Sequence, residues 1–228
     1  MLEVLYEDNH LIAVNKRSGD IIQGDRTGDA PLSEDVKAYI KKKYNKPGDV
    51  FLGTIHRIDR PVTGVVVFAR TSKALARMNA MFQKKEVQKT YWAVVKQQPP
   101  SRAEKLVHYL KKNESKNKSF ASPTEKSGTK RAELEYRLVG RSDHYYLLEV
   151  LPKTGRHHQI RVQLSTIGCP IRGDLKYGFD RSNRDGSIHL HARKIEFLHP
   201  VKKEPVSIEA PPPQDRLWES IARNLGDD

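Results

Sequence analysis

Two short segments of the chain concentrate ionisable residues of the kinds that carry acid–base and nucleophilic chemistry. The first, Gly53 to Gly64, contains the run His56-Arg57-Ile58-Asp59-Arg60. The second, Lys153 to Leu164, contains the run Arg156-His157-His158-Gln159-Ile160-Arg161. Each segment adjoins an apolar run, and the ends of secondary-structure elements are where functional sites are usually built. The two segments are therefore the first candidates for a site.

Asp59 is the leading candidate for a reactive carboxylate, because it lies in a loop that leads into the apolar run Val65–Phe68. Such a run indicates a buried strand, which would give the loop a rigid support. An arginine near a buried aspartate keeps it ionised and fixes its direction, and Arg161 is the candidate for that role. Arg57 and Arg60 flank Asp59 and could contact phosphates. The alternative interpretation is an ordinary turn-forming aspartate.

The charge balance favours a polyanionic partner. The chain has 228 residues, with 41 Lys and Arg against 28 Asp and Glu, which gives a net charge of +13. Nucleic acid is the leading candidate, and a generally basic protein is the alternative. Residues 102–131 carry nine basic and three acidic residues, so we expect an exposed hairpin or long loop that is either a solvated surface or a nucleic-acid contact.

Several classes of protein are disfavoured. No apolar stretch approaches the roughly 20 residues of a membrane span, and no signal peptide is readable at the start. Cys169 is the only cysteine, which excludes a disulfide scaffold and a cysteine-rich metal site and indicates a cytoplasmic protein with a packed thiol. The sequence holds neither of the glycine-rich phosphate-loop motifs, so nucleotide cofactors are disfavoured.

Histidines leave a metal site as an open alternative. His189 and His191 are two residues apart and would share one face of a strand. His157 and His158 are adjacent, and on a helix they would point apart. Because no H-E-x-x-H motif accompanies them, we expect no metal, and a metal-dependent nuclease or hydrolase using His189 and His191 is a rival hypothesis.

The elements that would position these residues alternate irregularly along the chain. Helices are expected over residues 32–43 with Ser33 as N-cap, from Ser72 onward, over 154–168 with Arg161 on its polar side, and over 215–225 with Gly226 after its end. Strands are expected near residues 4–6, 11–14, 65–68, 91–96, 145–151 and 188–198. The pattern predicts a single α+β domain, residues 1–228, around a mixed, largely antiparallel central sheet flanked by helices.

Segments along the chain resemble, in order, the motifs of the RluA-type pseudouridine synthases. Asn15-Lys16-Arg17-Ser18-Gly19 is similar to N-K-P-x-G, with Arg17 in place of the proline, and His56–Gly64 resembles H-R-L-D-x-x-T-S-G, with Val62-Thr63 in place of Thr-Ser. Lys89–Ala93 is similar to K-x-Y-x-A, and Thr154–Arg161 resembles T-G-R-x-H-Q-I-R. The motif G-D-x-x-Y-G is resembled by Gly173-Asp174 with Tyr177-Gly178, and the motif L-H-A by Leu190-His191-Ala192. Gln163 stands where histidine is common in the family.

The resemblance implies a role for each matching residue. It makes Asp59 the catalytic aspartate, Tyr91 the aromatic residue that packs on the target base, and Arg161 the partner of Asp59. It makes Leu190 or a neighbour the apolar floor of the site, and Arg57 the residue that enters the RNA stack when the base is extruded. His56, Arg60, Arg156, His158 and Gln159 are expected to bind substrate as members of the same motifs.

The resemblance also implies the reaction and its requirements. The expected activity is isomerisation of specific uridines to pseudouridine in structured RNA, either rRNA or tRNA, by a monomeric cytoplasmic enzyme. Because nothing is oxidised and no group leaves, no cofactor or metal is needed, and one carboxylate suffices as nucleophile or base. We expect the catalytic domain without the accessory N-terminal RNA-binding domain that is frequent in the family. The rival hypothesis is a catalytically silent RNA-binding protein on the same scaffold.

Overall fold

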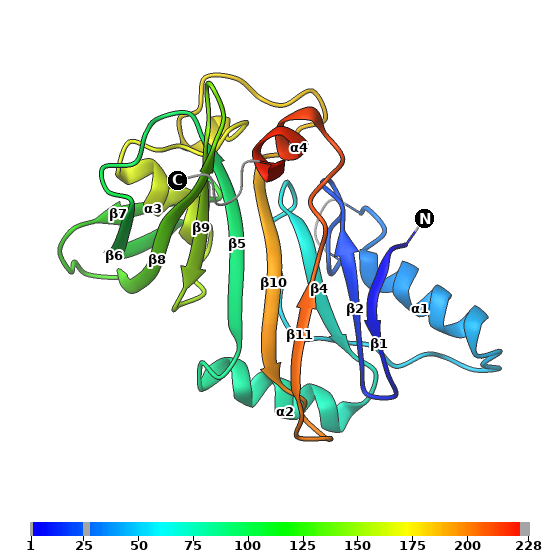
Figure 1. The fold of residues 1–228 in the computed structure, drawn as a ribbon. Coiled ribbons are helices and arrows are strands. Elements are labelled where there is room, and N and C mark those ends of the chain that lie inside the picture. The colour runs from blue at the N-terminus through cyan, green and yellow to red at the C-terminus, as the bar shows by residue number, and fades with distance from the viewer. Residues whose placement is uncertain (1, 25–27, 224–228) are drawn as a thin grey trace. The chain divides into compact units, whose positions relative to one another are not determined.

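The computed structural model describes residues 2–24 and 28–223, and these form two compact units. Unit 1 comprises residues 1–89 and 192–212, and unit 2 comprises residues 90–191 and 213–228. Both units combine helices with strands in antiparallel ladders (Figure 1), so the expected α+β fold with a largely antiparallel sheet is confirmed. No helix in the described ranges is long and apolar enough to cross a membrane.

Unit 1 is built on strands around two that are buried, at Leu11–Lys16 and Thr63–Ala69. Its strands are β1 (Val4–Glu7), β2 (Leu11–Lys16), β3 (Gly53–Thr54), β4 (Thr63–Ala69), most of β10 (Leu190–Leu198) and β11 (Pro205–Glu209). β2 pairs antiparallel with both β1 and β4, and β11 pairs antiparallel with β10. Every residue of β4 is buried, as the continuous apolar run at 65–68 predicts for a strand covered on both faces.

Two helices cover the strands of unit 1. α1 (Leu32–Lys43) places Val36 and Ile40 against Val66 and Phe68 in one apolar cluster. The expectation that Ser33 caps α1 is wrong, because Pro31 occupies the N-cap position without a side-chain hydrogen bond. α2 (Ser72–Gln83) is capped by Thr71, whose hydroxyl accepts a hydrogen bond from the amide of Ala74 at 3.2 Å.

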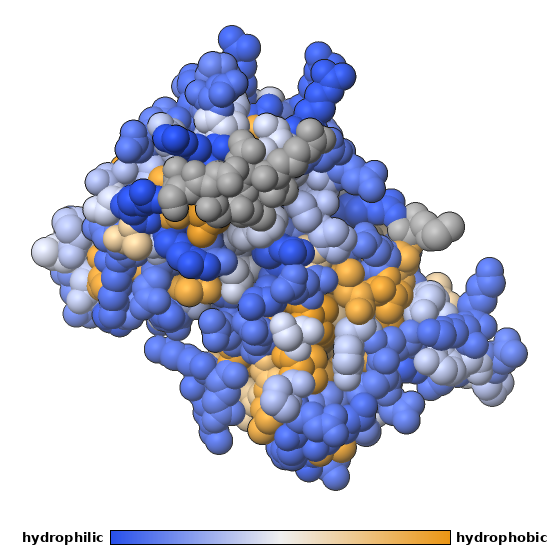
Figure 2. Space-filling model, viewed as in Figure 1, coloured by the Kyte–Doolittle hydropathy of each residue, from blue (hydrophilic) through white to orange (hydrophobic). Residues whose placement is uncertain are grey.

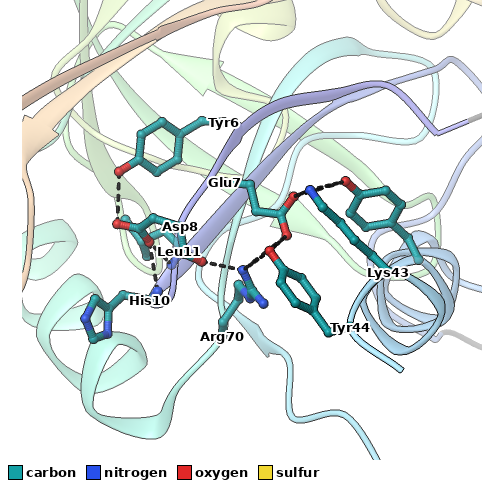
Figure 3. A network of polar contacts seen from close by, with 9 residues as sticks. Tyr6, Glu7, Asp8, His10, Leu11, Lys43, Tyr44 and Arg70 are labelled. Carbon is teal, nitrogen blue, oxygen red and sulfur yellow. Dashed lines mark hydrogen bonds and ion pairs between the residues drawn. The ribbon is translucent and has the colours of Figure 1, made fainter. Parts of the chain in front are cut away.

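A polar network ties β1 to the end of α1 (Figure 3). The Glu7 carboxylate accepts hydrogen bonds from Lys43 at 2.6 Å, from the hydroxyl of Tyr44 at 2.8 Å and from Arg70 at 3.1 Å. Burial raises the pKa of Glu7, but the hydrogen bonds from Lys43 and Tyr44 outweigh burial and leave the pKa below its ordinary value. The network is therefore satisfied internally, and it is a structural feature of unit 1.

Unit 2 is a strongly curved set of long strands with one helix on each face (Figure 1). The strands are β5 (Gln88–Val95), β6 (Ala103–Asn113), β7 (Lys118–Ser122), β8 (Lys130–Arg141) and β9 (Tyr146–Pro152), in the order β5-β9-β8-β6-β7 and all antiparallel. The helices are α3 (Gln159–Thr166) and α4 (Arg216–Arg223), and a 3₁₀ turn, η1, spans Leu175–Tyr177. Figure 2 shows that the face in view is largely hydrophilic, which agrees with the 30% of charged residues in the sequence.

The structure confirms the expected hairpin within residues 102–131, which consists of β6 and β7. Sequence analysis did not identify β8, although alternation of Ala132, Leu134 and Tyr136 with charged residues marks a half-buried strand. Asp215 caps α4, because its carboxylate accepts hydrogen bonds from the amides of residues 217 and 218, both at 2.9 Å. Residues 225 and 226, expected at the end of that helix, lie outside the described residues.

Candidate active site

Asp59 is half-buried in the loop that joins β3 to β4. Its carbonyl accepts a hydrogen bond from the amide of Val62 at 3.0 Å, which closes a tight turn. The second residue of β4 is Gly64, whose φ is +115° and where an added Cβ would lie 2.3 Å from the carbonyl oxygen of Ala192. Only glycine can take that conformation at so close an approach, so the loop is fixed at its C-terminal side.

The other support of this loop is Lys16, which is 1% exposed at the end of β2. Its ammonium donates to the carbonyl oxygens of Arg17 at 2.8 Å, Arg60 at 3.0 Å and Val62 at 2.8 Å. Burial lowers the pKa of Lys16 to about 8, against the opposing influence of the nearby carboxylates Asp20 and Asp59. A buried cation therefore fastens the turn that carries Asp59, by contacts with its backbone.

The remaining residues of this segment divide between interior and surface. The half-buried ring of His56 accepts a hydrogen bond from the amide of Val67 at 3.0 Å and stacks on Phe82, with centroids 5.3 Å apart. Burial, together with the charge of Lys89, lowers the pKa of His56 to about 3, so this ring is neutral. Arg57 is exposed, and the exposed Arg60 forms an ion pair of 2.7 Å with Asp29.

In unit 2, Arg161 is 5% exposed, which corrects the expectation that it lies on a polar face of its helix. Its Nε donates to Asp174 Oδ2 at 2.7 Å and its terminal nitrogen donates to Asp174 Oδ1 at 2.8 Å. The guanidinium carbon lies 5.0 Å from the centroid of the Tyr177 ring. This bidentate pair and the aromatic face fix the direction of Arg161.

Tyr177 links Arg161 to the segment that precedes α3. Its hydroxyl accepts a hydrogen bond from the amide of Ser119 at 2.8 Å and lies 2.9 Å from Nδ1 of His158, to which it can donate. Burial and the charge of Arg161 lower the pKa of His158 to about 2, so the ring is neutral and accepts this bond. His158 takes a left-handed conformation, with φ of 54°, directly before α3 begins.

The helix therefore starts at Gln159, five residues later than expected. Gln159 holds the preceding turn: its Oε1 accepts from the Thr154 hydroxyl at 2.7 Å and from the Arg156 amide at 3.0 Å. Because His157 and His158 precede the helix, their rings stack with centroids 3.7 Å apart. The expectation that these rings point apart is thus wrong. The Arg156 side chain is exposed and donates to the carbonyl of residue 131 at 3.1 Å.

Tyr91 and Leu190 both fall within the residues of unit 2. Tyr91 is half-buried in β5 opposite Val150, and Leu190 is 3% exposed at the start of β10. His189 stacks on Trp218 at 5.4 Å and lies 3.3 Å from Asp215. Among the described residues, no group of three or more His, Cys, Asp or Glu side chains could hold a metal ion. Cys169 is buried, and burial raises the pKa of its thiol.

Unit 1 thus holds Asp59, His56, Arg57 and Arg60, and unit 2 holds the other expected site residues: Tyr91, Arg156, His158, Gln159, Arg161 and Leu190. The pairing of Asp59 with Arg161 stays a prediction. Lys16, Asp174 and Tyr177 were not among the residues predicted for the site. The signal for all three was present, because each belongs to a segment that had been matched to a family motif.

The comparisons with solved structures define the fold as that of a pseudouridine synthase catalytic domain. The human RNA pseudouridylate synthase domain containing 4 superposes with a TM-score of 0.80 at 23% identity, over 95% of this chain and 90% of that chain. Human RNA pseudouridylate synthase domain containing 1 gives 0.72 at 22% identity, over 96% of this chain and 86% of that chain.

The family follows from the sequence comparisons. Residues 10–166 match the model of the RNA pseudouridylate synthase family, so the chain belongs to that family of enzymes. Relatives include ribosomal large subunit pseudouridine synthase C of Buchnera aphidicola, 33% identical over 91% of this chain and 66% of the relative. Another is tRNA pseudouridine synthase C of Haemophilus influenzae, 32% identical over 99% of this chain and 98% of the relative. The chain spans about two thirds of the ribosomal relatives.

Proposed function

We propose that this protein isomerises specific uridines to pseudouridine in rRNA or tRNA, as one catalytic domain formed by both units and acting as a monomer. The observation that carries the proposal is the family match over residues 10–166, which contains Asp59, Tyr91 and Arg161. The named relatives act on the large ribosomal subunit or on tRNA. The net charge of +13 supports attraction to phosphates, which should weaken steeply with salt.

The proposed reaction breaks the bond between ribose C1′ and uracil N1, turns the base and joins C1′ to C5. The C5 proton leaves to a base and N1 gains a proton, so atoms and electrons balance without an oxidant or a leaving group. Asp59 acts on the ribose, as nucleophile at C1′ or as base on a sugar proton. Arg161 keeps Asp59 ionised, Tyr91 packs on the uracil and accepts the C5 proton, and Leu190 provides an apolar floor.

The substrate must be unstacked before it can react. Extrusion of a base costs roughly a few kcal/mol, which contacts from protein side chains offset. We assign the exposed Arg57 to insertion into the RNA stack, and Arg60 and Arg156 to phosphates. His56, His158 and Gln159 form hydrogen bonds within their own units. They contribute to RNA binding indirectly, by holding the loops in which they lie.

Release of tritium from RNA labelled at C5 of uridine tests the proposal. The substrate is bulk RNA from cells that lack this protein, separated into large-subunit rRNA and tRNA fractions. We expect release from one fraction by the wild type, loss of release with Asp59→Asn, and unchanged release with Asp35→Asn, which removes an exposed carboxylate on α1. Full activity of Asp59→Asn would refute the assigned role. RNA binding without tritium release by the wild type would favour the silent RNA-binding alternative.

A further inference from the structure

The β6–β7 ribbon, residues 109–122, presents an aromatic ring on a basic surface. In the strand register Lys111 lies opposite Phe120, and Asn113 lies opposite Lys118. Side chains two residues apart along a strand share a face, so Lys111, Lys118 and Phe120 lie on one face of the ribbon. Ser119, on the other face, is buried and bonds to His157. The shared face of Lys111, Lys118 and Phe120 is the outer face of the ribbon.

Phe120 is unusual for a surface residue of a strand. It is 48% exposed, and it contacts a cation: the Lys118 ammonium lies 5.8 Å from the centroid of its ring and 5.1 Å from that of Tyr177. A large apolar side chain left in water contributes little to folding. Its position beside an ammonium group is an arrangement that suits a ligand with both a flat ring and a negative charge.

The lysines of the ribbon are available for such a ligand. Residues 109–122 contain four lysines and one glutamate, and that glutamate pairs with Lys112 at 2.6 Å. Lys111, Lys116 and Lys118 have no carboxylate within ion-pair distance in the described part of the chain. The neighbouring pair of strands differs, because Lys105 on β6 and Arg131 on β8 both form ion pairs with Glu133. The two cations beside the ribbon thus share one carboxylate, whereas Lys111, Lys116 and Lys118 on the ribbon have none among the described residues.

The ribbon is also held rigidly to the segment that leads to Arg161. His157 bonds to the Ser119 hydroxyl at 2.9 Å and to the Asn117 side chain at 3.1 Å. Lys176 donates to the carbonyl of Asn117 at 3.1 Å. Tyr177 joins the amide of Ser119 to the face of the Arg161 guanidinium. A ligand on the outer face would thus be held in a fixed relation to Arg161.

We propose that the outer face of the β6–β7 ribbon binds an unpaired nucleotide of the substrate RNA, with its base stacked on Phe120 and flanking phosphates on Lys111 and Lys118. The inference rests on the proposed function, because it takes the partner to be the RNA substrate. Stacking on an aromatic side chain tolerates any base, and lysines on either side follow the backbone. The ribbon thereby adds affinity for RNA that is single-stranded next to the target uridine.

Binding of a fluorescent oligouridylate of about 12 nucleotides, within the site sizes of single-strand binders, tests the inference. Phe120→Ser should weaken binding about 5- to 100-fold. Replacing Lys111 and Lys118 together by glutamine should lower the slope of log K against log salt by about 1.4, from two lost phosphate contacts. The matched controls in unit 1 are Leu198→Ser, at a 45% exposed strand residue, and Lys41→Gln with Lys42→Gln on α1. Neither control should change binding.

A second readout does not depend on loss of binding. The Phe120→Trp variant keeps an aromatic face, so it should bind as tightly as the wild type, and the fluorescence of the new indole should be quenched when the oligonucleotide is added. Unquenched emission would overturn this inference. So would binding by Phe120→Ser and by the lysine double variant that is as tight as that of the wild type. In either case, tritium release by the wild type would still support the proposed function. Absence of both RNA binding and tritium release in the wild type would refute the proposed function itself.

Discussion

Replacement of Lys16 by methionine tests whether a buried cation holds the Asp59 loop in place. The ammonium donates to the carbonyls of Arg17, Arg60 and Val62, and methionine fills a similar volume without a donor. The substitution leaves three inward-facing carbonyl groups without their charged partner. We expect the turn that carries Asp59 to loosen, because a main-chain acceptor that loses its partner inside a protein must find another.

The size of the effect follows from two opposing contributions. Each hydrogen bond to a charged donor contributes about 1.5–3 kcal/mol, and three are lost. Against this, the fall of the Lys16 pKa from 10.5 to about 8, with burial as its main cause, corresponds to a net cost of about 3 kcal/mol for the charged form, which methionine removes. The net loss in the free energy of unfolding should be about 2–6 kcal/mol, since the three bonds do not add fully.

Urea unfolding and tritium release measure the two consequences separately. Lys42→Met, at an exposed lysine in the last turn of α1, is the control for loss of a positive charge. Under conditions in which Lys16→Met is fully folded, its turnover should still be lower than that of the wild type, because Asp59 is displaced. If Lys16→Met unfolds at the same urea concentration as Lys42→Met and turns over as fast, then Lys16 does not support the loop.

Two further predictions concern unit 2. Asp174→Asn should lower turnover about 10²-fold, because Arg161 is then misplaced. KM for RNA should stay nearly unchanged, and Asp174→Glu should restore part of the turnover. A rise in KM as large as the fall in turnover would contradict a positioning role. The pKa of His158 is about 2 in the folded protein and near 6.5 in the unfolded chain. Below about pH 6.5 only the unfolded chain gains this proton. The free energy of unfolding therefore falls by about 1.4 kcal/mol for each pH unit below that point. Urea unfolding between pH 7 and 5 should therefore show a shallower loss for His158→Gln than for the wild type, whereas His144→Gln, at an exposed histidine, should keep the full slope.

The sequence predicted those elements whose signals are local. The apolar run at 65–68 predicted β4, and Thr71 and Asp215 lie at helix starts where their side chains cap the amides. Ser33 has the residue type of a cap, but Pro31 already sets the start of α1. The helix expected over 154–168 is present as α3, but its start depends on Gln159, whose side chain holds the turn before it.

The chemistry of the site was less accessible because it depends on contacts between distant segments. Arg161, three residues after His158, was expected on a polar face of its helix. It is instead buried, and the carboxylate of Asp174 balances its charge there. His56 has the residue type of a proton donor, but burial and the charge of Lys89 keep its ring neutral, and it packs on Phe82. Residue type alone does not distinguish a histidine that meets substrate from one that packs, since the partners decide its pKa.

The contacts that hold the candidate residues in place explain why short motifs far apart in this chain serve one function. The catalytic candidate in unit 1, Asp59, sits on a turn fastened by a lysine from the first motif, 43 residues earlier in sequence. The candidate in unit 2, Arg161, is oriented by an aspartate and a tyrosine from the motif that follows it. In each unit, buried polar contacts hold a charged group in place. The loss of such a buried contact costs more free energy than the loss of an exposed one. Side chains fixed in this way need little rearrangement when a ligand binds, so under the proposed function the free energy of RNA binding remains available for base extrusion.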